Sequence, residues 1–279
     1  MKVGTSEGLH IISSRLYNNL KLDLRMIFEN EQKTQPITKL QVMEAFKRVK
    51  ANGGSAGVDN ISIEQVDKSK RKYLYPLWNR MASGSYFPKA VRQTLIPKGK
   101  GKMRALGIPT VVDRVAQQVI ATELERIVDK TFSDNSFGYR AKKSAHQAVE
   151  QCRINCMKYS WVIDIDIKGF FDNIDHELLM QAVQWHTDSK HILLYCNRWL
   201  EAPIQLPDGT IKEPQGKGTP QGGVISPVLA NIFLDVVFDK WIEKRNPEVV
   251  FERYADDIVV HCHHIKEALR LLEAIKERF

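Results

Sequence analysis

The segment Trp-Val-Ile-Asp-Ile-Asp-Ile at residues 161–167 most constrains the fold of this chain, because it sets two carboxylates into an apolar strand. Runs of this character predict a strand that is buried on both faces. Side chains alternate along a strand, so Asp164 and Asp166 would share one face. A lone buried carboxylate is destabilising by several kcal/mol unless it meets a cation. The segment therefore predicts a cation beside its acidic face.

A second acidic pair lies in residues 251–262, which read Phe-Glu-Arg-Tyr-Ala-Asp-Asp-Ile-Val-Val-His-Cys. The two apolar runs predict a β-hairpin with Asp256 and Asp257 at its turn, although aspartate is also common in solvated turns. If this hairpin lies beside the 161–167 strand, Asp166 and Asp256 converge on one oxygen-rich cluster. Such a cluster suits Mg²⁺, and two Mg²⁺ ions about 4 Å apart serve in-line phosphoryl displacement. The pattern predicts a nucleotidyl-transfer centre.

A basic segment supplies a candidate phosphate clamp. Residues 89–108 contain two short strand-like runs around Lys-Gly-Lys-Gly-Lys, which predict a β-hairpin. Lys98 and Arg104 would lie on its two strands and bind a triphosphate, whereas the alternative is a mobile solvated loop. Residues 89–104 contain no acid, and their cations are Lys89, Arg92, Lys98, Lys100, Lys102 and Arg104.

A glycine-rich segment, residues 216–223, precedes a predicted helix that opens with Ser226 as N-cap and Pro227 as first residue. Glycines beside Pro220-Gln221 permit close approach of a large ligand, and a helix N-terminus favours phosphate. The alternative is a flexible connection between a hairpin and a helix.

Composition narrows the class of partner. The 279 residues carry a formal charge of +8, which favours a polyanion such as nucleic acid or an acidic membrane surface. The sequence holds no apolar stretch long enough to cross a membrane and no signal-peptide core, so we expect a cytoplasmic protein.

The four cysteines, Cys152, Cys156, Cys196 and Cys262, have no paired metal-ligand spacing and are interpreted as reduced core thiols. The run His-Cys-His-His at 261–264 would alternate across two strand faces, which disfavours a metal site there.

Periodicity and capping signals predict the remaining elements of an α+β fold. Helices are expected over 11–30, 37–50, from Ser62 with Gln65 in a capping box, 110–130, 144–158, twice within 176–200, and 265–279, with a second hairpin turning at residues 207–209.

Several of these segments resemble the catalytic blocks of reverse transcriptases, most closely those of group II intron-encoded maturases. They are "GGSAGVDN", "LIPKGKGKMRALGIPTVVDRVAQQVI", "SFGYRAKKSAHQAV", "DIDIKGFFDNIDHELL", "TPQGGVISPVLANIFL" and "YADD". The resemblance covers roughly residues 40–279. It implies the fingers and palm of a right-hand polymerase, with a small antiparallel palm sheet packed on helices.

The resemblance also implies an organisation in domains. Residues 1–40 would form an N-terminal helical extension, 41–155 the fingers with the basic hairpin 89–108, and 156–279 the palm. The family continues into a primer grip and a thumb, so we expect a fragment that synthesises DNA weakly or not at all.

Site residues follow from the same resemblance. Asp166, Asp256 and Asp257 would be catalytic and would bind two Mg²⁺ together with Ile167, with Asp164 as a neighbour only. Lys98 and Arg104 would hold the triphosphate, and Phe171 would exclude a ribose 2′-hydroxyl. Gln221 and Gly222 would contact the template–primer and the nascent base pair.

The implied function is RNA-directed DNA synthesis for a group II intron. The partners would be an RNA template, a DNA primer, deoxynucleoside triphosphates and the intron RNA, whose splicing and retrohoming the protein would assist. Candidate RNA contacts include Arg140, Lys142 and Lys143. No membrane is expected, a homodimer is possible on exposed palm surface, and the compartment would be bacterial cytoplasm or an organellar matrix.

Two alternatives stay open. Retron, diversity-generating and CRISPR-associated reverse transcriptases share the catalytic blocks. A non-catalytic RNA-binding splicing cofactor would need only the basic surface, but such a module has no need for a costly carboxylate cluster.

Overall fold

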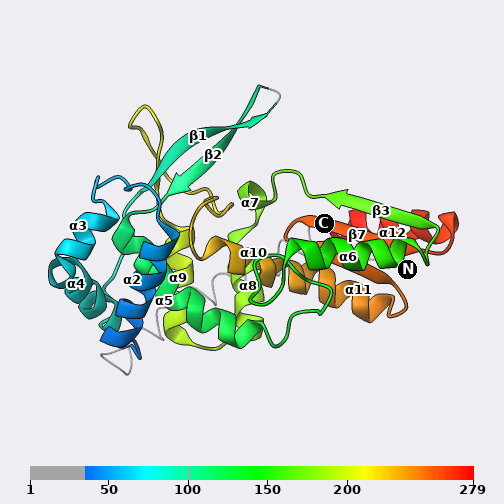
Figure 1. Ribbon diagram of the computed structural model, residues 1–279, viewed down its shortest axis with the longest axis horizontal. Helices are drawn as coiled ribbons and strands as arrows, with labels where there is room; N and C mark the ends of the chain where they lie inside the picture. Colours follow the sequence, from blue (N-terminus) through cyan, green and yellow to red (C-terminus); the bar gives the residue numbers. More distant parts are fainter. Residues whose placement is uncertain (1–34, 100) are drawn as a thin grey trace.

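The computed structural model describes residues 35–99 and 101–279 and has the α+β character that the sequence predicts (Figure 1). The helix predicted over 11–30, and Lys100, lie outside the described residues. Within the described part of the chain, no helix combines the length and apolar character that a membrane span needs.

The helices alternate with short strands along the chain. The helices are α2 (Lys39–Asn52), α3 (Ile63–Lys68), α4 (Lys70–Ala82), α5 (Val111–Val128), α6 (Ala145–Cys156), α7 (Phe170–Asn173), α8 (His176–His186), α9 (Lys190–Leu200), α10 (Ser226–Leu234), the π-helical turn η1 (Asp235–Asp239), α11 (Lys240–Arg245) and α12 (Ile265–Arg278). The strands are β1 (Val91–Gly99), β2 (Lys102–Ile108), β3 (Trp161–Asp166), β4 (Ile204–Gln205), β5 (Ile211–Lys212), β6 (Val250–Tyr254) and β7 (Asp257–Cys262).

Local signals explain where the first helices begin and end. A capping box of Thr38 and Gln41 starts α2, and the predicted box of Ser62 and Gln65 starts α3. Helix α2 ends at Gly53, whose φ of 67° suits glycine. The helices predicted over 37–50 and from Ser62 are therefore confirmed. Those predicted over 110–130, 144–158, 176–200 and 265–279 are also confirmed, as α5, α6, α8 with α9, and α12.

The described residues form two sheets. In the first, β1 and β2 make the predicted basic hairpin, and β1 also pairs with β4, which gives the order β2-β1-β4-β5. In the second, antiparallel sheet, the order is β3-β7-β6. The first sheet projects from the middle of the elongated molecule, and the second lies near one end of its long axis (Figure 1).

The prediction that the 161–167 strand is buried on both faces is wrong. Strand β3 is the edge of the second sheet, where Trp161 and Val162 are 45% and 49% exposed. Only Ile163 is fully buried, against the core of the sheet. β3 pairs with β7 along one edge, and the face of β3 opposite Ile163, which carries Asp164 and Asp166, is exposed to solvent.

The second sheet packs its two faces differently. Phe251, Ile258 and Val260 face a core that also contains Leu271 and Ile275 of α12. Helix α6 contacts β6 and β7, and in Figure 1 it runs over the sheet on the side away from α12. A larger apolar core joins α2, α4 and α5 to α8, α9 and α10.

A buried ion pair holds the turn between β6 and β7. The Arg253 guanidinium donates to both carboxylate oxygens of Asp239, with Nε–Oδ1 at 2.7 Å and Nη2–Oδ2 at 2.5 Å. Its third nitrogen donates to the Asn231 side chain and to the carbonyl oxygen of Ala255 in the turn. Both charged side chains are completely buried. The turn is thus fixed from the core side by η1 and α10.

A second buried network holds the glycine-rich segment. The Asp113 carboxylate accepts hydrogen bonds from Tyr86, Trp199 and Gln117. The Gln117 side-chain oxygen in turn accepts from the backbone of Val224 at 2.8 Å. Helix α5 therefore anchors the segment just before α10.

The N-cap prediction for Ser226 is wrong by one residue. Ile225 occupies the cap position, and Ser226 is the first helical residue. Its hydroxyl donates to the carbonyl oxygen of Pro220 and accepts from Thr219 instead of capping the helix. The hydroxyl closes the glycine-rich loop on itself.

We expect removal of either partner of the Arg253–Asp239 pair to be strongly destabilising. Asp239→Asn would leave the positive charge of Arg253 uncompensated in the core, and Arg253→Met would leave the carboxylate of Asp239 without its donors. Each variant should lower the free energy of unfolding by about 3–5 kcal/mol. Urea denaturation measures this, and the double variant should cost less than the two single variants added together. Glu273→Gln, which breaks the exposed pair with Lys276, is the control and should cost under about 1 kcal/mol. Additive or sub-kcal/mol losses would contradict the assignment.

We also expect Asp113 to make folding depend on pH. Burial raises the pKa of Asp113 to about 6, against the opposing hydrogen bonds from Trp199, Tyr86 and Gln117. A carboxyl whose folded pKa is raised contributes stability below its unfolded pKa and loses it as pH rises through the folded value. Between pH 7 and pH 4, wild type should gain up to about 3 kcal/mol of unfolding free energy relative to Asp113→Asn. A pH-independent difference in urea denaturation would refute this.

Candidate active site

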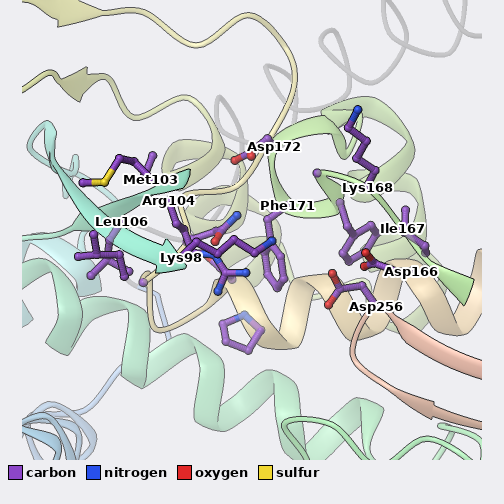
Figure 2. A pocket seen from close by; sticks show the side chains of 18 of the residues that line it. Lys98, Met103, Arg104, Leu106, Asp166, Ile167, Lys168, Phe171, Asp172 and Asp256 are labelled. Atoms are coloured by element: carbon purple, nitrogen blue, oxygen red, sulfur yellow. The ribbon is translucent and has the colours of Figure 1, made fainter. Parts of the chain in front are cut away.

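A cleft of about 640 Å³ lies between the β1–β2 hairpin and the end of the second sheet that carries Asp166 and Asp256 (Figure 2). Its walls come from the hairpin, the start of α7, the glycine-rich loop and the turn between β6 and β7. All but one of the predicted site residues line it, namely Lys98, Arg104, Asp166, Ile167, Phe171, Gln221, Gly222 and Asp256.

The exception, Asp257, lies beside the cleft. It is the first residue of β7 and pairs directly with Asp166, the last residue of β3. Antiparallel pairing brings the end of one strand to the start of the other, so the two acidic segments meet although 90 residues separate them in sequence. Asp256 sits in the turn, and Figure 2 shows its carboxylate turned toward that of Asp166.

The acidic end of the cleft carries uncompensated negative charge. Partial burial, and then the nearby carboxylates of Asp256, Asp166 and Asp164, raise the pKa of Asp257. Within residues 35–99 and 101–279, none of these four aspartates forms an ion pair. Like charges gathered without a counter-ion, and with oxygen as the only donor, are suited to a hard divalent cation.

The acidic turn has a constrained backbone. Ala255 has a φ of 56°, which is unfavourable for a residue other than glycine and is typical of functional sites. The segment before Gly138 pairs with β6, with hydrogen bonds from Phe137 to Arg253 and from Arg253 to Asn135. A Cβ at Gly138 would collide with the backbone nitrogen of Ala255, so only glycine permits this close packing.

The opposite end of the cleft is basic. Lys98 and Arg104 lie on the two strands of the hairpin, and in Figure 2 both side chains extend toward Phe171. Both are exposed, and neither forms an ion pair within the described part of the chain. Two free cations face a group of free carboxylates across one cleft, an arrangement that fits a bound polyphosphate with its metal ions.

Phe171 and the glycine-rich loop form the floor between these ends. The Phe171 ring is half-buried and packs on Phe170 with ring centroids 5.5 Å apart. Gly222 has a φ of 107°, and a Cβ there would come within 2.5 Å of the carbonyl oxygen of Gly107 in β2. The amide of Gly107 donates to the carbonyl of Gln221 at 2.6 Å, so the loop is attached to the hairpin.

Sequence reasoning missed further residues of the cleft. Tyr139 lines the cleft, and its backbone φ is 55°. Burial, and then the charge of Asp256, raise the pKa of its hydroxyl. Met103, Leu106, Lys168 and Asp172 also line it, although Lys168 points outward in Figure 2. Tyr139 falls in the segment 136–149 that resembles a family block, but no spacing or charge signal singled it out.

Arg140 does not suit the predicted role as a free RNA contact. Its guanidinium binds the Asp129 carboxylate at 2.8 Å and the carbonyl oxygens of Asp129, Ser133 and Ser136. Only 7% of its side chain is exposed. Arg140 is therefore a structural residue that holds the loop after α5.

Comparisons with known proteins show which family this chain resembles. Residues 96–279 match the family described as reverse transcriptase (RNA-dependent DNA polymerase). Protein YkfC of Escherichia coli is 30% identical over 258 residues, which cover 79% of this chain and 66% of YkfC. The group II intron-encoded protein LtrA of Lactococcus lactis is 30% identical over 224 residues, covering 76% of this chain and 36% of LtrA.

One further relative extends the comparison. The putative COX1/OXI3 intron 1 protein of Saccharomyces cerevisiae is 32% identical over 202 residues, covering 72% of this chain and 24% of that protein. Each of these relatives is thus matched over less than two thirds of its own length.

A solved structure, apo telomerase from Candida tropicalis truncated from its C-terminal domain, superposes with a TM-score of 0.50 at 14% identity. It covers 67% of this chain and 46% of that one, and it supports the polymerase fold. The resemblance to intron-encoded reverse transcriptases seen in the sequence is confirmed. Because the family match spans most of the chain and the fold agrees, this chain belongs to the reverse transcriptase (RNA-dependent DNA polymerase) family.

Proposed function

We propose that this protein is the RNA-directed DNA polymerase of a group II intron, which adds deoxynucleotides to a DNA primer on an RNA template. We further propose that it binds its intron RNA and thereby assists splicing and retrohoming. One observation carries the proposal: unpaired carboxylates and unpaired cations face each other across a single cleft in a chain of the reverse transcriptase family.

The donor set fits a pair of Mg²⁺ ions. Asp166, Asp256 and Asp257 offer carboxylate oxygens, and Ile167 can offer only its backbone carbonyl because its side chain is apolar. When bound, two Mg²⁺ supply activation of the primer 3′-oxygen and stabilisation of the leaving oxygen.

The remaining residues would bind and orient the substrates. Lys98 and Arg104 would hold the phosphates of the incoming nucleotide and fix its α-phosphate relative to the acidic end. Gln221 and Gly222 would support the nascent base pair, since glycine leaves the backbone accessible there. Phe171, between the two ends, would contact the sugar.

The intron assignment is supported by the names of the relatives. LtrA is described as a group II intron-encoded protein, and two related Arabidopsis thaliana proteins are described as nuclear intron maturases. The formal charge of +8 agrees with an RNA partner. Retron, diversity-generating and CRISPR-associated enzymes are the alternative polymerases.

A second candidate function is that of an RNA-binding splicing cofactor without polymerase activity. It would need the basic surface but not the carboxylates, whose partial burial and then mutual repulsion raise the pKa of Asp257. The presence of that unfavourable cluster favours the polymerase.

We predict that, in the full-length protein that contains this chain, Asp256→Asn reduces RNA-templated primer extension in Mg²⁺ by at least about 10²-fold, because it removes a metal-binding oxygen that acts in the transition state. RNA affinity, measured by filter binding, should be unchanged or slightly higher, since a negative charge is lost. Asp208→Asn in the exposed turn between β4 and β5 is the control. Activity of Asp256→Asn within tenfold of wild type would refute the metal assignment. Absence of extension by wild type, with intact RNA binding and splicing, would favour the cofactor.

We predict that Phe171→Ala admits ribonucleotides in the full-length protein that contains this chain. A rigid ring beneath the sugar would clash with a 2′-hydroxyl, so discrimination arises from repulsion that the smaller residue lacks. Single-nucleotide insertion kinetics should show the preference for deoxynucleotides falling by about tenfold or more. Met103→Ala, which opens the cleft from the hairpin side, should leave the preference intact. Unchanged selectivity in Phe171→Ala would place the sugar discrimination elsewhere.

A further inference from the structure

Helix α6 and strand β7 bring together three potential metal ligands outside the cleft. Cys152 and Cys156 lie one turn apart on α6, and His261 lies on β7. One ligand atom from each, two sulfurs and an imidazole nitrogen, all lie within 4.8 Å of one another. The sequence spacing gave no sign of this cluster, because the packing of α6 against the sheet creates it. Cys156 is exposed and Cys152 partly buried, so neither is the core thiol expected from the sequence.

The His261 ring is held as a metal ligand would be. It is 1% exposed, and Nε2 lies 2.6 Å from Oε2 of Glu252 on β6. The other oxygen of Glu252 accepts a hydrogen bond from Asn155 on α6. A neutral imidazole that donates from Nε2 keeps its lone pair on Nδ1. Nδ1 makes no hydrogen bond to any residue between 35 and 279 that the structure describes.

Distances and donor chemistry favour a soft or borderline metal ion. Zn–S bonds of about 2.3 Å in a tetrahedron place two sulfurs about 3.8 Å apart. The Sγ atoms of Cys152 and Cys156 are 4.0 Å apart. A disulfide would need them at about 2.05 Å, which is a much larger movement. A carboxylate bound to the second nitrogen of a ligand histidine is the usual support of such sites.

We propose that Cys152, Cys156 and His261 bind one Zn²⁺ ion, with Glu252 orienting the imidazole and a fourth position open on the exposed side of Cys156. The site lies on the same face of the sheet as the catalytic aspartates. It is four residues along β7 from Asp257, a separation of about 13 Å. Its sulfur and nitrogen donors also distinguish it from the all-oxygen set of the cleft.

The ion would attach α6 to the strand that begins at the catalytic turn. Asn155 and Glu252 already join α6 to β6 by one hydrogen bond. Coordination of one ion by Cys152 and His261 would add a metal bridge between the same helix and β7. The ion would therefore cross-link α6 to β7, and its loss would loosen the sheet without removing any cleft residue.

The test is a metal titration of the full chain under reducing conditions with excess Mg²⁺, which occupies oxygen sites. We expect one equivalent of Co²⁺ to bind with a thiolate-to-cobalt charge-transfer band and to be displaced by Zn²⁺. Zn²⁺ should also raise the melting temperature. Asp256→Asn should bind Co²⁺ as wild type does, so this readout is independent of polymerase activity.

Variants assign the ligands. Cys156→Ser, at an exposed position that tolerates change, and the double variant with Cys152→Ser should lose the charge-transfer band while keeping the wild-type circular dichroism. Glu252→Gln should weaken Co²⁺ binding by about 10- to 100-fold. Cys196→Ala and His264→Ala are the matched controls, because neither residue belongs to the cluster, and both should bind Co²⁺ normally.

Three results would overturn the proposal. The first is the absence of a stoichiometric Co²⁺ band in wild-type protein whose thiols are reduced. The second is an equal band in the Cys152→Ser and Cys156→Ser double variant. The third is a Cys152–Cys156 disulfide whose reduction does not restore metal binding, which would make the pair a redox element.

Discussion

The Arg253–Asp239 ion pair is the interaction on which the acidic end of the cleft depends. A single guanidinium binds η1 through Asp239, α10 through Asn231 and the acidic turn through the carbonyl of Ala255. Asn231 also donates to the carbonyl of Gly138, which packs against the same turn. Because both charges are fully buried, the pair is stable only when every partner is in place. The position of the turn is therefore set by the core and not by the solvent-facing carboxylates.

This support allows the turn to be unfavourable in itself. Ala255 has a left-handed backbone conformation, and three neighbouring aspartates raise the pKa of Asp257 after burial has done so. An isolated hairpin would relax both features, whereas the packing around Arg253 holds them. The glycine-rich loop at the floor of the cleft is fixed in the same manner, since the network of Asp113 and Gln117 holds the backbone of Val224. A site whose acidic turn and floor are both held by buried networks is preorganised for charged ligands.

The parts of the fold that the sequence predicts are those with a local signal, such as a helix cap or alternating apolar residues in a strand. The capping box of Ser62 and Gln65 located the start of α3, and strand-like runs located the hairpins of residues 89–108 and 251–262. The expected approach of Asp166 to the acidic turn follows from the antiparallel pairing of β3 with β7. Properties that depend on distant packing were missed. Strand β3 is exposed because it lies at the edge of its sheet. Arg140 is buried in an ion pair and hydrogen bonds because its loop folds back on the end of α5. The partners Arg253 and Asp239, like His261 and the two thiols of α6, have no fixed spacing that a sequence pattern could reveal.

The attachment of Gly222 to Gly107 has a mechanical consequence. No Cβ separates the two backbones, and the amide of Gly107 is bound to the carbonyl of Gln221. The hairpin and the loop before α10 are therefore in direct backbone contact and would move together as one unit. A displacement of β2, on which Arg104 lies, would therefore also displace the backbone of Gln221 and Gly222 at the floor of the cleft.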